Sequence, residues 1–133
     1  MSGLTFDTGA LIALERKRLS MTRVYTVAQR AGVRITVPTV AVAEWWRLGA
    51  GRRFRDALLA SVIVEDLTQR IAGLAGDALG LVSRARPDVG TIDCIVMTSA
   101  WLRGDTVYTS DIDDLDAIRG SVPAFARVSI QRA

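Results

Sequence analysis

Four acidic side chains stand at positions from which they could share one metal ion. Asp7 and Asp111 each follow a short apolar stretch and precede a helical pattern. Glu44 and Asp93 lie early in apolar helical segments that follow a strand or a loop. Parallel strands would bring such positions to one edge of a sheet, where carboxylates without a basic partner raise one another's pKa. A divalent cation relieves that repulsion, and Mg²⁺ held by carboxylates can orient a phosphodiester and activate a water molecule.

Each of these acids also has a structural explanation. An aspartate at the position of Asp7 is a favoured N-cap, because its side-chain oxygen accepts hydrogen bonds from free helix N–H groups. Asp93 falls in a first helical turn, where the helix dipole favours a carboxylate. Glu44 lies among apolar residues, and Arg47 three residues later is a possible ion-pair partner. The local sequence leaves both interpretations open for each acid.

A run of acids follows the segment 106–109. It consists of Asp111, Asp113, Asp114 and Asp116. All of them fall at the end of an expected strand or in the turn that follows it. We expect at most two of the four to face a cleft and the others to be solvated.

The lack of histidine narrows the possible chemistry. The chain contains no histidine and a single cysteine, Cys94. Ser-His and Cys-His catalysis, histidine general bases and HExxH zinc sites are therefore excluded, as is a disulfide within the chain. A bound metal would have only oxygen ligands, which suits Mg²⁺ or Mn²⁺ better than zinc. With no base to activate its thiol, Cys94 is expected to be a small core residue.

The basic residues are almost all arginines. The formal net charge is +3, and Lys17 is the only lysine among the 17 basic residues. The densest basic cluster is Arg52, Arg53 and Arg55. We interpret it first as a solvated helix face and second as a patch that contacts phosphate, since guanidinium groups suit bidentate phosphate binding. The basic excess permits a nucleic-acid partner without demonstrating one.

Chain length and hydropathy indicate one soluble domain. The 133 residues are half hydrophobic and about a quarter charged, as in globular domains. No stretch approaches the roughly 18 apolar residues needed to cross a bilayer, and the N-terminus lacks the pattern of a signal peptide. We therefore expect a single domain over residues 1–133, located in the cytoplasm and without a membrane partner.

The expected elements alternate along the chain. Short apolar segments predict strands at 4–6, 33–37, 62–64, 106–109 and 127–130. Helical patterns cover 8–18, 20–31, 38–48, 57–61, 68–84 and 91–102. This alternation is typical of an α/β domain with a central, mostly parallel sheet of about five strands flanked by helices.

Two further patterns concern packing. Gly73, Gly76 and Gly80 recur at helical spacing and suggest close approach of another helix. Trp45 and Trp46 point to different sides of their helix, so we expect one in the core and the other at a subunit contact.

Several stretches resemble the PIN-domain ribonucleases, and in particular the VapC-type toxins of bacterial toxin–antitoxin pairs. The similarity covers nearly the whole chain, in order and at family-like separations. It lies in the stretches 6–15, 42–44, 91–96 and 107–115. The first stretch and Thr109–Leu115 are its most specific parts.

The resemblance implies a PIN fold with a Mg²⁺ or Mn²⁺ centre. It matches Asp7, Glu44, Asp93 and Asp111 to the family's acidic quartet. It places Asp114 in a supporting role or at a second metal, and Thr109 beside the site. It further implies cleavage of a structured RNA, such as tRNA or rRNA, by metal-activated water. Family members form homodimers and are inhibited by a cognate VapB antitoxin.

Other interpretations remain. A phosphoaspartate receiver or a haloacid-dehalogenase-type phosphatase also carries an aspartate after its first strand, but both usually need a lysine near the phosphoryl group. Lys17, the only lysine, lies in a basic run at a helix end, and Gly9 stands where such a phosphatase has its second aspartate. A catalytically inactive PIN-like binding module is the main alternative, and DNA in place of RNA is a further one.

Overall fold

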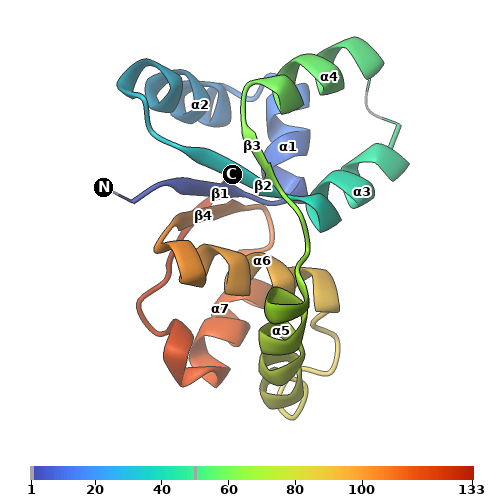
Figure 1. The fold of residues 1–133 in the computed structure, drawn as a ribbon, viewed down its shortest axis with the longest axis vertical. Coiled ribbons are helices and arrows are strands. Elements are labelled where there is room, and N and C mark those ends of the chain that lie inside the picture. The colour runs from blue at the N-terminus through green and yellow to red at the C-terminus, as the bar shows by residue number, and fades with distance from the viewer. Residues whose placement is uncertain (1, 50) are drawn as a thin grey trace.

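A computed structural model describes residues 2–49 and 51–133. Within them, five strands alternate with seven α-helices and one short 3₁₀ helix (Figure 1). The strands are β1 (Leu4–Phe6), β2 (Ile35–Pro38), β3 (Ile63–Glu65), β4 (Thr106–Thr109) and β5 (Ser129–Arg132). The helices are α1 (Thr8–Glu15), α2 (Leu19–Ala31), α3 (Thr39–Arg47), α4 (Arg52–Ala60), α5 (Gln69–Val82), α6 (Thr91–Arg103), α7 (Ile112–Ser121) and the 3₁₀ helix η1 (Pro123–Phe125).

All five strands form one parallel sheet in the order β3-β2-β1-β4-β5. The chain leaves the central strand β1 for β2 on one side and later enters β4 on the other. The carboxyl ends of β1 and β4 therefore flank the point where the strand order reverses, which is the usual ligand position in open α/β sheets. The α/β class and the parallel sheet predicted from the sequence are confirmed.

Helices cover both faces of the sheet, so the domain has two apolar cores. In Figure 1, α1, α2 and α4 lie above the sheet and α5, α6 and α7 lie below it. The upper core contains Phe6 and Trp45, both fully buried, and the lower core contains Met97 and Leu115. This double coverage explains why all four residues of β2 are buried, on both of its faces. No helix in residues 2–49 or 51–133 has the length and apolar character that crossing a membrane requires.

Several element boundaries differ from the predictions. The first helix ends at Glu15 and not near residue 18, because Lys17 adopts a left-handed conformation with φ of 56°. Arg52, Arg53 and Arg55 lie inside α4, which starts five residues earlier than predicted. The second, third and fifth strands are shifted by one or two residues, a normal error for short strands.

The packing predictions had mixed outcomes. Cys94 and Trp45 are fully buried, as expected, while Trp46 is 48% exposed. The expected close packing at the α5 glycines is wrong. A Cβ at Gly73, Gly76 or Gly80 would meet nothing within 4 Å. The face of α5 that packs is the opposite one, formed by Ile71, Ala75, Ala78 and Val82.

Candidate functional site

Asp7 is both a helix cap and a buried carboxylate. It follows β1 directly, and its Oδ1 accepts a hydrogen bond from the Ala10 N–H at 3.0 Å. The N-cap interpretation is therefore confirmed, and the Thr109 hydroxyl and the Gly9 N–H also favour the ionised carboxylate. Its side chain is nearly fully buried, and this burial raises its pKa to about 6. None of the described basic residues pairs with Asp7, and a buried carboxylate without a cationic partner favours a proton or a bound cation.

Gly9 lets two chain segments approach each other closely. A Cβ at Gly9 would lie 2.0 Å from the Ser110 Oγ and 2.8 Å from the Ser110 backbone N. Any larger residue would push the turn after β4 away from the start of α1. The absent side chain thus allows Asp7 and Asp111 to lie close enough for the charge of Asp111 to raise the pKa of Asp7.

Asp111 lies in the turn between β4 and α7, and its side chain does not cap the helix that follows. Asp111 takes the N-cap position of α7, but its side chain makes no capping hydrogen bond and it is exposed. Its backbone N–H donates to the Thr109 Oγ1 at 2.9 Å. Thr109 is fully buried, and its hydroxyl also favours the ionised form of Asp7. Thr109 therefore organises the backbone between the two acids.

Asp93 lies among the other acids at the start of α6. Its pKa is raised to about 7, first by burial and then by the negative charges of Asp111, Asp7, Asp114 and Glu44. This influence shows that five carboxylates from four separate segments gather in one region. None of the ion pairs in the described part of the chain involves Asp7, Glu44, Asp93 or Asp111.

Glu44 is half-buried on α3 and forms no ion pair with Arg47. Its helix is attached to the site through Thr8, whose Oγ1 donates to the Ala41 carbonyl oxygen at 3.4 Å. Ala41 lies about one turn before Glu44 on the same helix. The contact between Thr8 and Ala41 therefore fixes the position of Glu44 relative to the start of α1.

Asp114 differs from the other acids because it has a cationic partner. The Arg86 guanidinium donates to the Asp114 Oδ1 at 2.6 Å and binds Asp88 through two further hydrogen bonds. This ion pair joins the loop before α6 to the first turn of α7. The two carboxylates raise the pKa of Arg86, and the guanidinium partly neutralises Asp114.

The acidic run lines a small open pocket of about 220 Å³. Asp111, Asp113 and Asp114 all line it, together with Ser110 and Ile112 of the same segment. All three stand at the N-terminus of α7, where side chains tilt toward the helix start. Asp116, one turn further, is ion-paired with Arg119. Arg132, at the end of β5, is the one basic residue lining this pocket, and sequence reasoning missed it.

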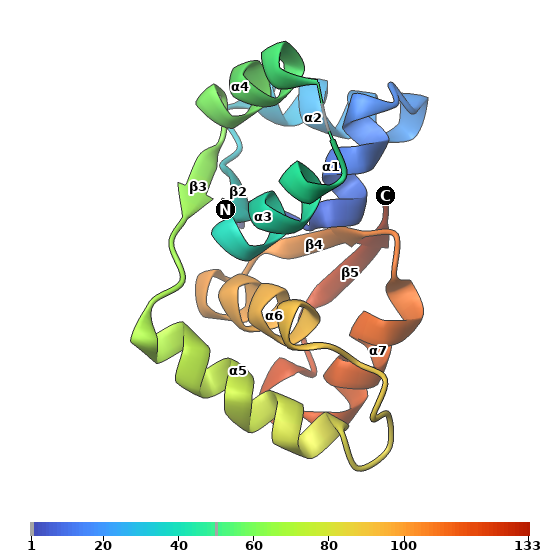
Figure 2. The ribbon, with the colours of Figure 1, turned by 90° about the vertical axis from the view of Figure 1, so that its right-hand side faces the viewer.

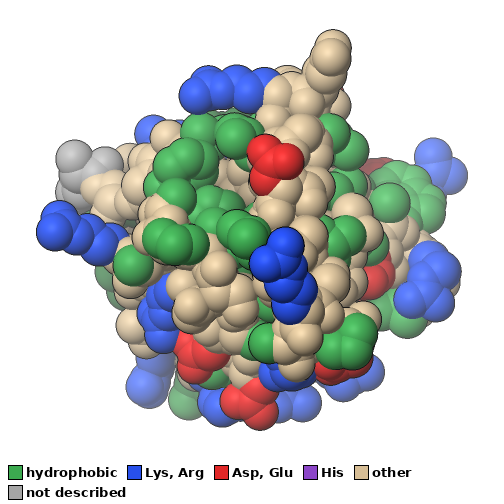
Figure 3. Space-filling view, turned by 90° about the horizontal axis from the view of Figure 1, so that it is seen from below, with side chains coloured by type: hydrophobic (Ala, Val, Ile, Leu, Met, Phe, Trp, Pro, Cys, Tyr) green, Lys and Arg blue, Asp and Glu red, His purple; other side chains and the backbone are tan. Residues whose placement is uncertain are grey.

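The arginines considered for phosphate binding are exposed or stacked, and none of them lines this pocket. Arg52 is largely exposed and forms a long 3.7 Å ion pair with Asp56, and Arg53 is exposed. The Arg55 guanidinium carbon lies 3.3 Å from the ring centroid of Trp46. On the face of the molecule toward α5 and α7, acidic and basic side chains are interspersed (Figure 3).

The donor types suit a hard divalent cation, because they are all carboxylates. The carboxylate groups are, however, too far apart in this structure to hold one ion together. In residues 2–49 and 51–133, no three acidic or cysteine side chains are close enough together to hold one metal ion. The carboxylates would have to close around a cation on binding.

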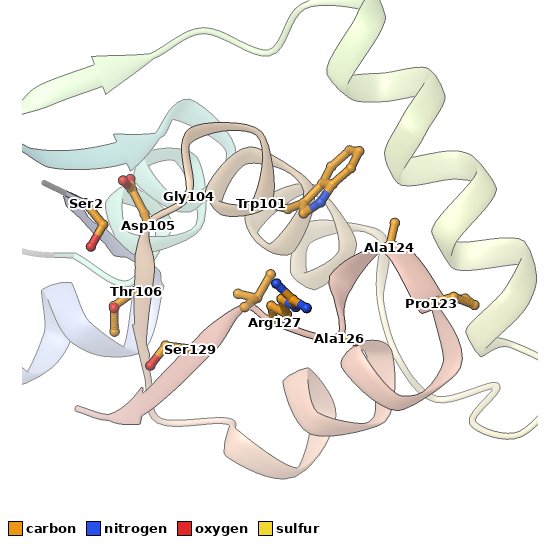
Figure 4. Close-up of a pocket in the computed structure, with 11 residues that line it drawn as sticks. Ser2, Trp101, Gly104, Asp105, Thr106, Pro123, Ala124, Ala126, Arg127 and Ser129 are labelled. Atoms are coloured by element: carbon orange, nitrogen blue, oxygen red, sulfur yellow. The ribbon is translucent and has the colours of Figure 1, made fainter.

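A second polar cluster lies within the domain and was not found from the sequence. Arg103 pairs with Asp105 at 2.9 Å and with Glu65, and Asp105 also accepts from Thr5 and Gly3. These bonds lower the pKa of Asp105 and keep its fully buried carboxylate ionised. Because every charge has a partner, the cluster is structural. A neighbouring pocket of about 490 Å³, near the start of β4 and β5, is lined by Trp101 and Arg127 (Figure 4).

The fold is similar to that of several solved toxin–antitoxin structures. A chain of VapBC2 from Rickettsia felis, bound to a DNA fragment from its promoter, matches with a TM-score of 0.77, 12% identity and 98% of each chain covered. DNA-bound VapBC from Salmonella typhimurium matches with a TM-score of 0.77 and 16% identity, over 99% of this chain and 98% of that one. A toxin–antitoxin complex from Klebsiella pneumoniae matches with a TM-score of 0.64 and 20% identity, over 92% and 94%.

No protein-family model and no curated protein sequence matches the chain. The likeness therefore rests on the arrangement of strands and helices, which extends over nearly the full length of both chains. The resemblance to VapC-type proteins seen in the sequence is confirmed at the level of the fold, and the chain is an α/β domain with a PIN-like fold.

Proposed function

We propose that the chain is a metal-dependent endoribonuclease and the toxin of a type II toxin–antitoxin pair. The observation that carries the proposal is the gathering of Asp7, Asp93, Asp111 and Glu44, none of which has an ion-pair partner among residues 2–49 and 51–133. Carboxylates brought together from four segments, at the usual ligand position of the sheet, are costly for the fold unless they bind something. Divalent cations are the ligands that fit this charge.

The four carboxylates would hold Mg²⁺ or Mn²⁺, with Asp114 as an additional ligand or supporting residue. The ion would supply Lewis-acid activation of water and of the scissile phosphate. Thr109 keeps the Asp111 backbone in place, and the cap bond to Ala10 orients the Asp7 carboxyl group. Glu44 contributes charge from α3, and its position depends on the contact between Thr8 and Ala41.

RNA is the substrate class that we favour, with structured RNA such as tRNA or rRNA as the form. The basic excess of the chain and its many arginines are suited to phosphate, although neither distinguishes RNA from DNA. The match to VapBC structures supports the toxin assignment and, with it, a VapB-type antitoxin as partner.

A second copy of the chain is a further proposed partner. In the part of the chain that the structure describes, strand β3 pairs with β2 alone, so one side of its backbone lies free at the edge of the sheet. Ile63 and Val64 on this strand and Leu67 after it are 39–49% exposed. An exposed apolar edge strand favours self-association, and we propose that homodimer formation covers it.

The direct test is cleavage of total bacterial RNA by the purified, antitoxin-free chain with Mg²⁺, with Mn²⁺ and with EDTA. Wild type should produce discrete fragments that require the metal. Asp93→Asn keeps the shape of the side chain and removes its charge, so it should lower cleavage by a factor on the order of 100 or more if metal binding depends on it. Asp77→Asn, an exposed acid on α5, is the matched control and should cleave like wild type.

Two outcomes would contradict this proposal. Equal cleavage by wild type and Asp93→Asn would point to a contaminating nuclease. No cleavage by folded wild type with either metal would favour the alternative of a catalytically inactive binding module.

A further inference from the structure

We propose that the outer surface of the α3–α4 hairpin binds an unpaired segment of RNA, with a base stacked on Trp46 and phosphates on the neighbouring arginines. We call Trp46, Arg47, Arg52, Arg53 and Arg55 the hairpin surface. The inference rests on the proposed function for its choice of RNA, and it adds a binding site beside the acids. Figure 2 shows α4 at one end of the molecule and α5 at the other, with α3 between them.

The first argument is the state of Trp46. Its side chain is 48% exposed, although an indole of this size is usually buried or partnered. The Arg55 guanidinium covers one part of it, with its central carbon 3.3 Å from the ring centroid. An aromatic ring with a stacked guanidinium is a surface on which a nucleobase can also stack, because every base has a π face.

The second argument is that the hairpin is fixed in advance. Trp45 is fully buried and packs edge-on against Phe54 of α4, with ring centroids 6.3 Å apart. Glu15, at the end of α1, accepts from the Trp45 indole Nε1 and from the Gly51 N–H, both at 3.3 Å. These contacts hold α3, α4 and α1 together, so Trp46 and Arg55 are positioned without cost at the moment of binding.

The third argument is charge. Four arginines lie on the hairpin surface, and the single acid paired with them is Asp56, at a distance of 3.7 Å from Arg52 where both side chains are well exposed. Such a pair is weak. The guanidinium of Arg55 is stacked on the Trp46 ring, and its Nε is buried and forms no hydrogen bond with the described residues. Phosphate groups are the anions that match this arrangement.

The fourth argument is the path from this surface to the acids. Successive helix residues are rotated by about 100°. Trp46 and Glu44 therefore flank the outer face of α3 on opposite sides, and between them lie Ala43 and Arg47, both exposed. The small side chain of Ala43 leaves the path open, and Arg47 adds a cation to it. A strand crossing one helix can thus contact Trp46 and reach the side of α3 that carries Glu44.

The test measures binding in EDTA of a 2′-O-methyl oligonucleotide, which cannot be cleaved, by fluorescence anisotropy at several salt concentrations. Trp46→Ala should weaken binding about 5- to 100-fold, the range found when a stacking aromatic is removed. Trp46→Phe keeps a ring and should retain most of the affinity. Arg55→Ala should also weaken the salt dependence of binding. The slope of log affinity against log salt concentration should become less steep by the amount that about one phosphate contact contributes.

The matched control is Arg127→Ala, which removes the same charge at the other edge of the sheet (Figure 4). It should leave both the affinity and the salt slope close to wild type. Sedimentation velocity of each variant shows whether its oligomeric state has changed. Because binding is measured without metal, the result does not depend on whether the chain cleaves RNA.

The proposal is overturned if Trp46→Ala binds the oligonucleotide like wild type, and equally if wild type does not bind it. Trp46→Ala that binds normally but sediments as a smaller species would assign this surface to a second copy of the chain. Normal cleavage of total RNA together with either result would leave the nuclease proposal intact. If Trp46→Ala binds more weakly than wild type and wild type does not cleave RNA, the result would contradict the nuclease proposal and support RNA binding at the hairpin surface.

Discussion

At the scale of single residues, the candidate site is defined by an electrostatic conflict. Asp7 and Asp93 have pKa values raised to about 6 and about 7, chiefly by burial and further by the acids around them. Asp88 and Asp105 have arginine partners, and their pKa values are lowered. Some of the acids are therefore neutralised by arginines, while others repel one another without a cationic partner. That contrast is typical of functional sites.

The conflict predicts how stability depends on pH without metal. A carboxylate whose pKa is higher in the folded state stabilises the fold only while it is protonated. The free energy of unfolding should therefore fall as pH rises from about 4 through 6 and 7. Asp7→Asn keeps the cap and cannot ionise, so it should be more stable than wild type at pH 8 by on the order of 2–3 kcal/mol.

Urea unfolding in EDTA at several pH values measures this difference. The advantage of Asp7→Asn should shrink as pH falls toward 4, and Mn²⁺ at pH 8 should stabilise wild type more than the variant. The lowered pKa values of Asp88 and Asp105 affect stability only in more acidic solution, and the chain has no histidine to titrate in this window. An advantage of the variant that did not change with pH would refute the electrostatic explanation.

A second residue-scale prediction concerns Gly9. Gly9→Ala places a methyl group against Ser110, whose backbone N would be only 2.8 Å away. We expect a loss of about 1–3 kcal/mol in unfolding free energy, as for other overpacked sites. Cleavage should fall together with stability because the turn that carries Asp111 has to move. Gly73→Ala, where a Cβ has open space, is the control and should not destabilise the chain.

At the scale of elements, polar contacts join segments that are distant in sequence. Asp105 precedes β4, Thr5 lies in β1, and Arg103 ends α6. Their hydrogen bonds set the relative positions of these elements. Thr8 and Ala41 do the same for α1 and α3, and Arg86 and Asp114 for the loop before α6 and α7. The acids lie near one another because these contacts fix the relative positions of the elements that carry them.

The Asp105 contacts predict a large effect for one substitution. Asp105→Ala removes the buried anion and leaves Arg103 with one partner fewer in a largely buried position. We expect a cost of about 3–5 kcal/mol, as when one member of a buried ion pair is lost. Asp88→Ala, which breaks an exposed pair with Arg86, should destabilise the chain far less than Asp105→Ala does. Comparable losses in urea unfolding for both variants would contradict the structural role of this cluster.

At the scale of the whole molecule, the arrangement of the sheet separates three surfaces. The acids lie at the carboxyl ends of the strands, the hairpin surface lies beside them on α3 and α4, and β3 forms a free edge. An enzyme that acts on a large, anionic substrate can use such an arrangement, with one surface for reaction, one for binding and one for assembly. Two of the solved structures with a similar fold are VapBC2 from Rickettsia felis and a toxin–antitoxin complex from Klebsiella pneumoniae.

The free edge leads to a prediction about assembly. Val64→Lys places a charge on β3, which should weaken self-association by a factor on the order of 10 or more because charged edge strands pair poorly. Sedimentation equilibrium measures the change. Val27→Lys, on the exposed side of α2, is the matched control, since Val27 is 64% exposed and belongs to a helix and not to the edge strand. If Val64→Lys associates like wild type, the dimer uses another surface.

The sequence by itself determined the fold class, the alternation of elements and the acids that could bind a metal. Strand and helix patterns are local, and so are caps such as those at Asp7 and Thr68, so they can be read from neighbouring residues. The lack of histidine excluded whole classes of chemistry on composition alone. The assignment of Asp7, Glu44, Asp93 and Asp111 to one set came from the resemblance to PIN domains.

Only the tertiary structure decided which residues meet. The raised pKa of Asp93 depends on acids from three other segments, and the position of Gly9 against Ser110 depends on strand order. The stacking of Arg55 on Trp46 and the buried Asp105 cluster join residues with no recognisable spacing in the sequence. The wrong prediction of close packing at Gly73, Gly76 and Gly80 has the same origin. Helical spacing shows that residues share one face of a helix, but it does not show whether another element covers that face. Contacts between distant segments are set by packing, which no local pattern contains.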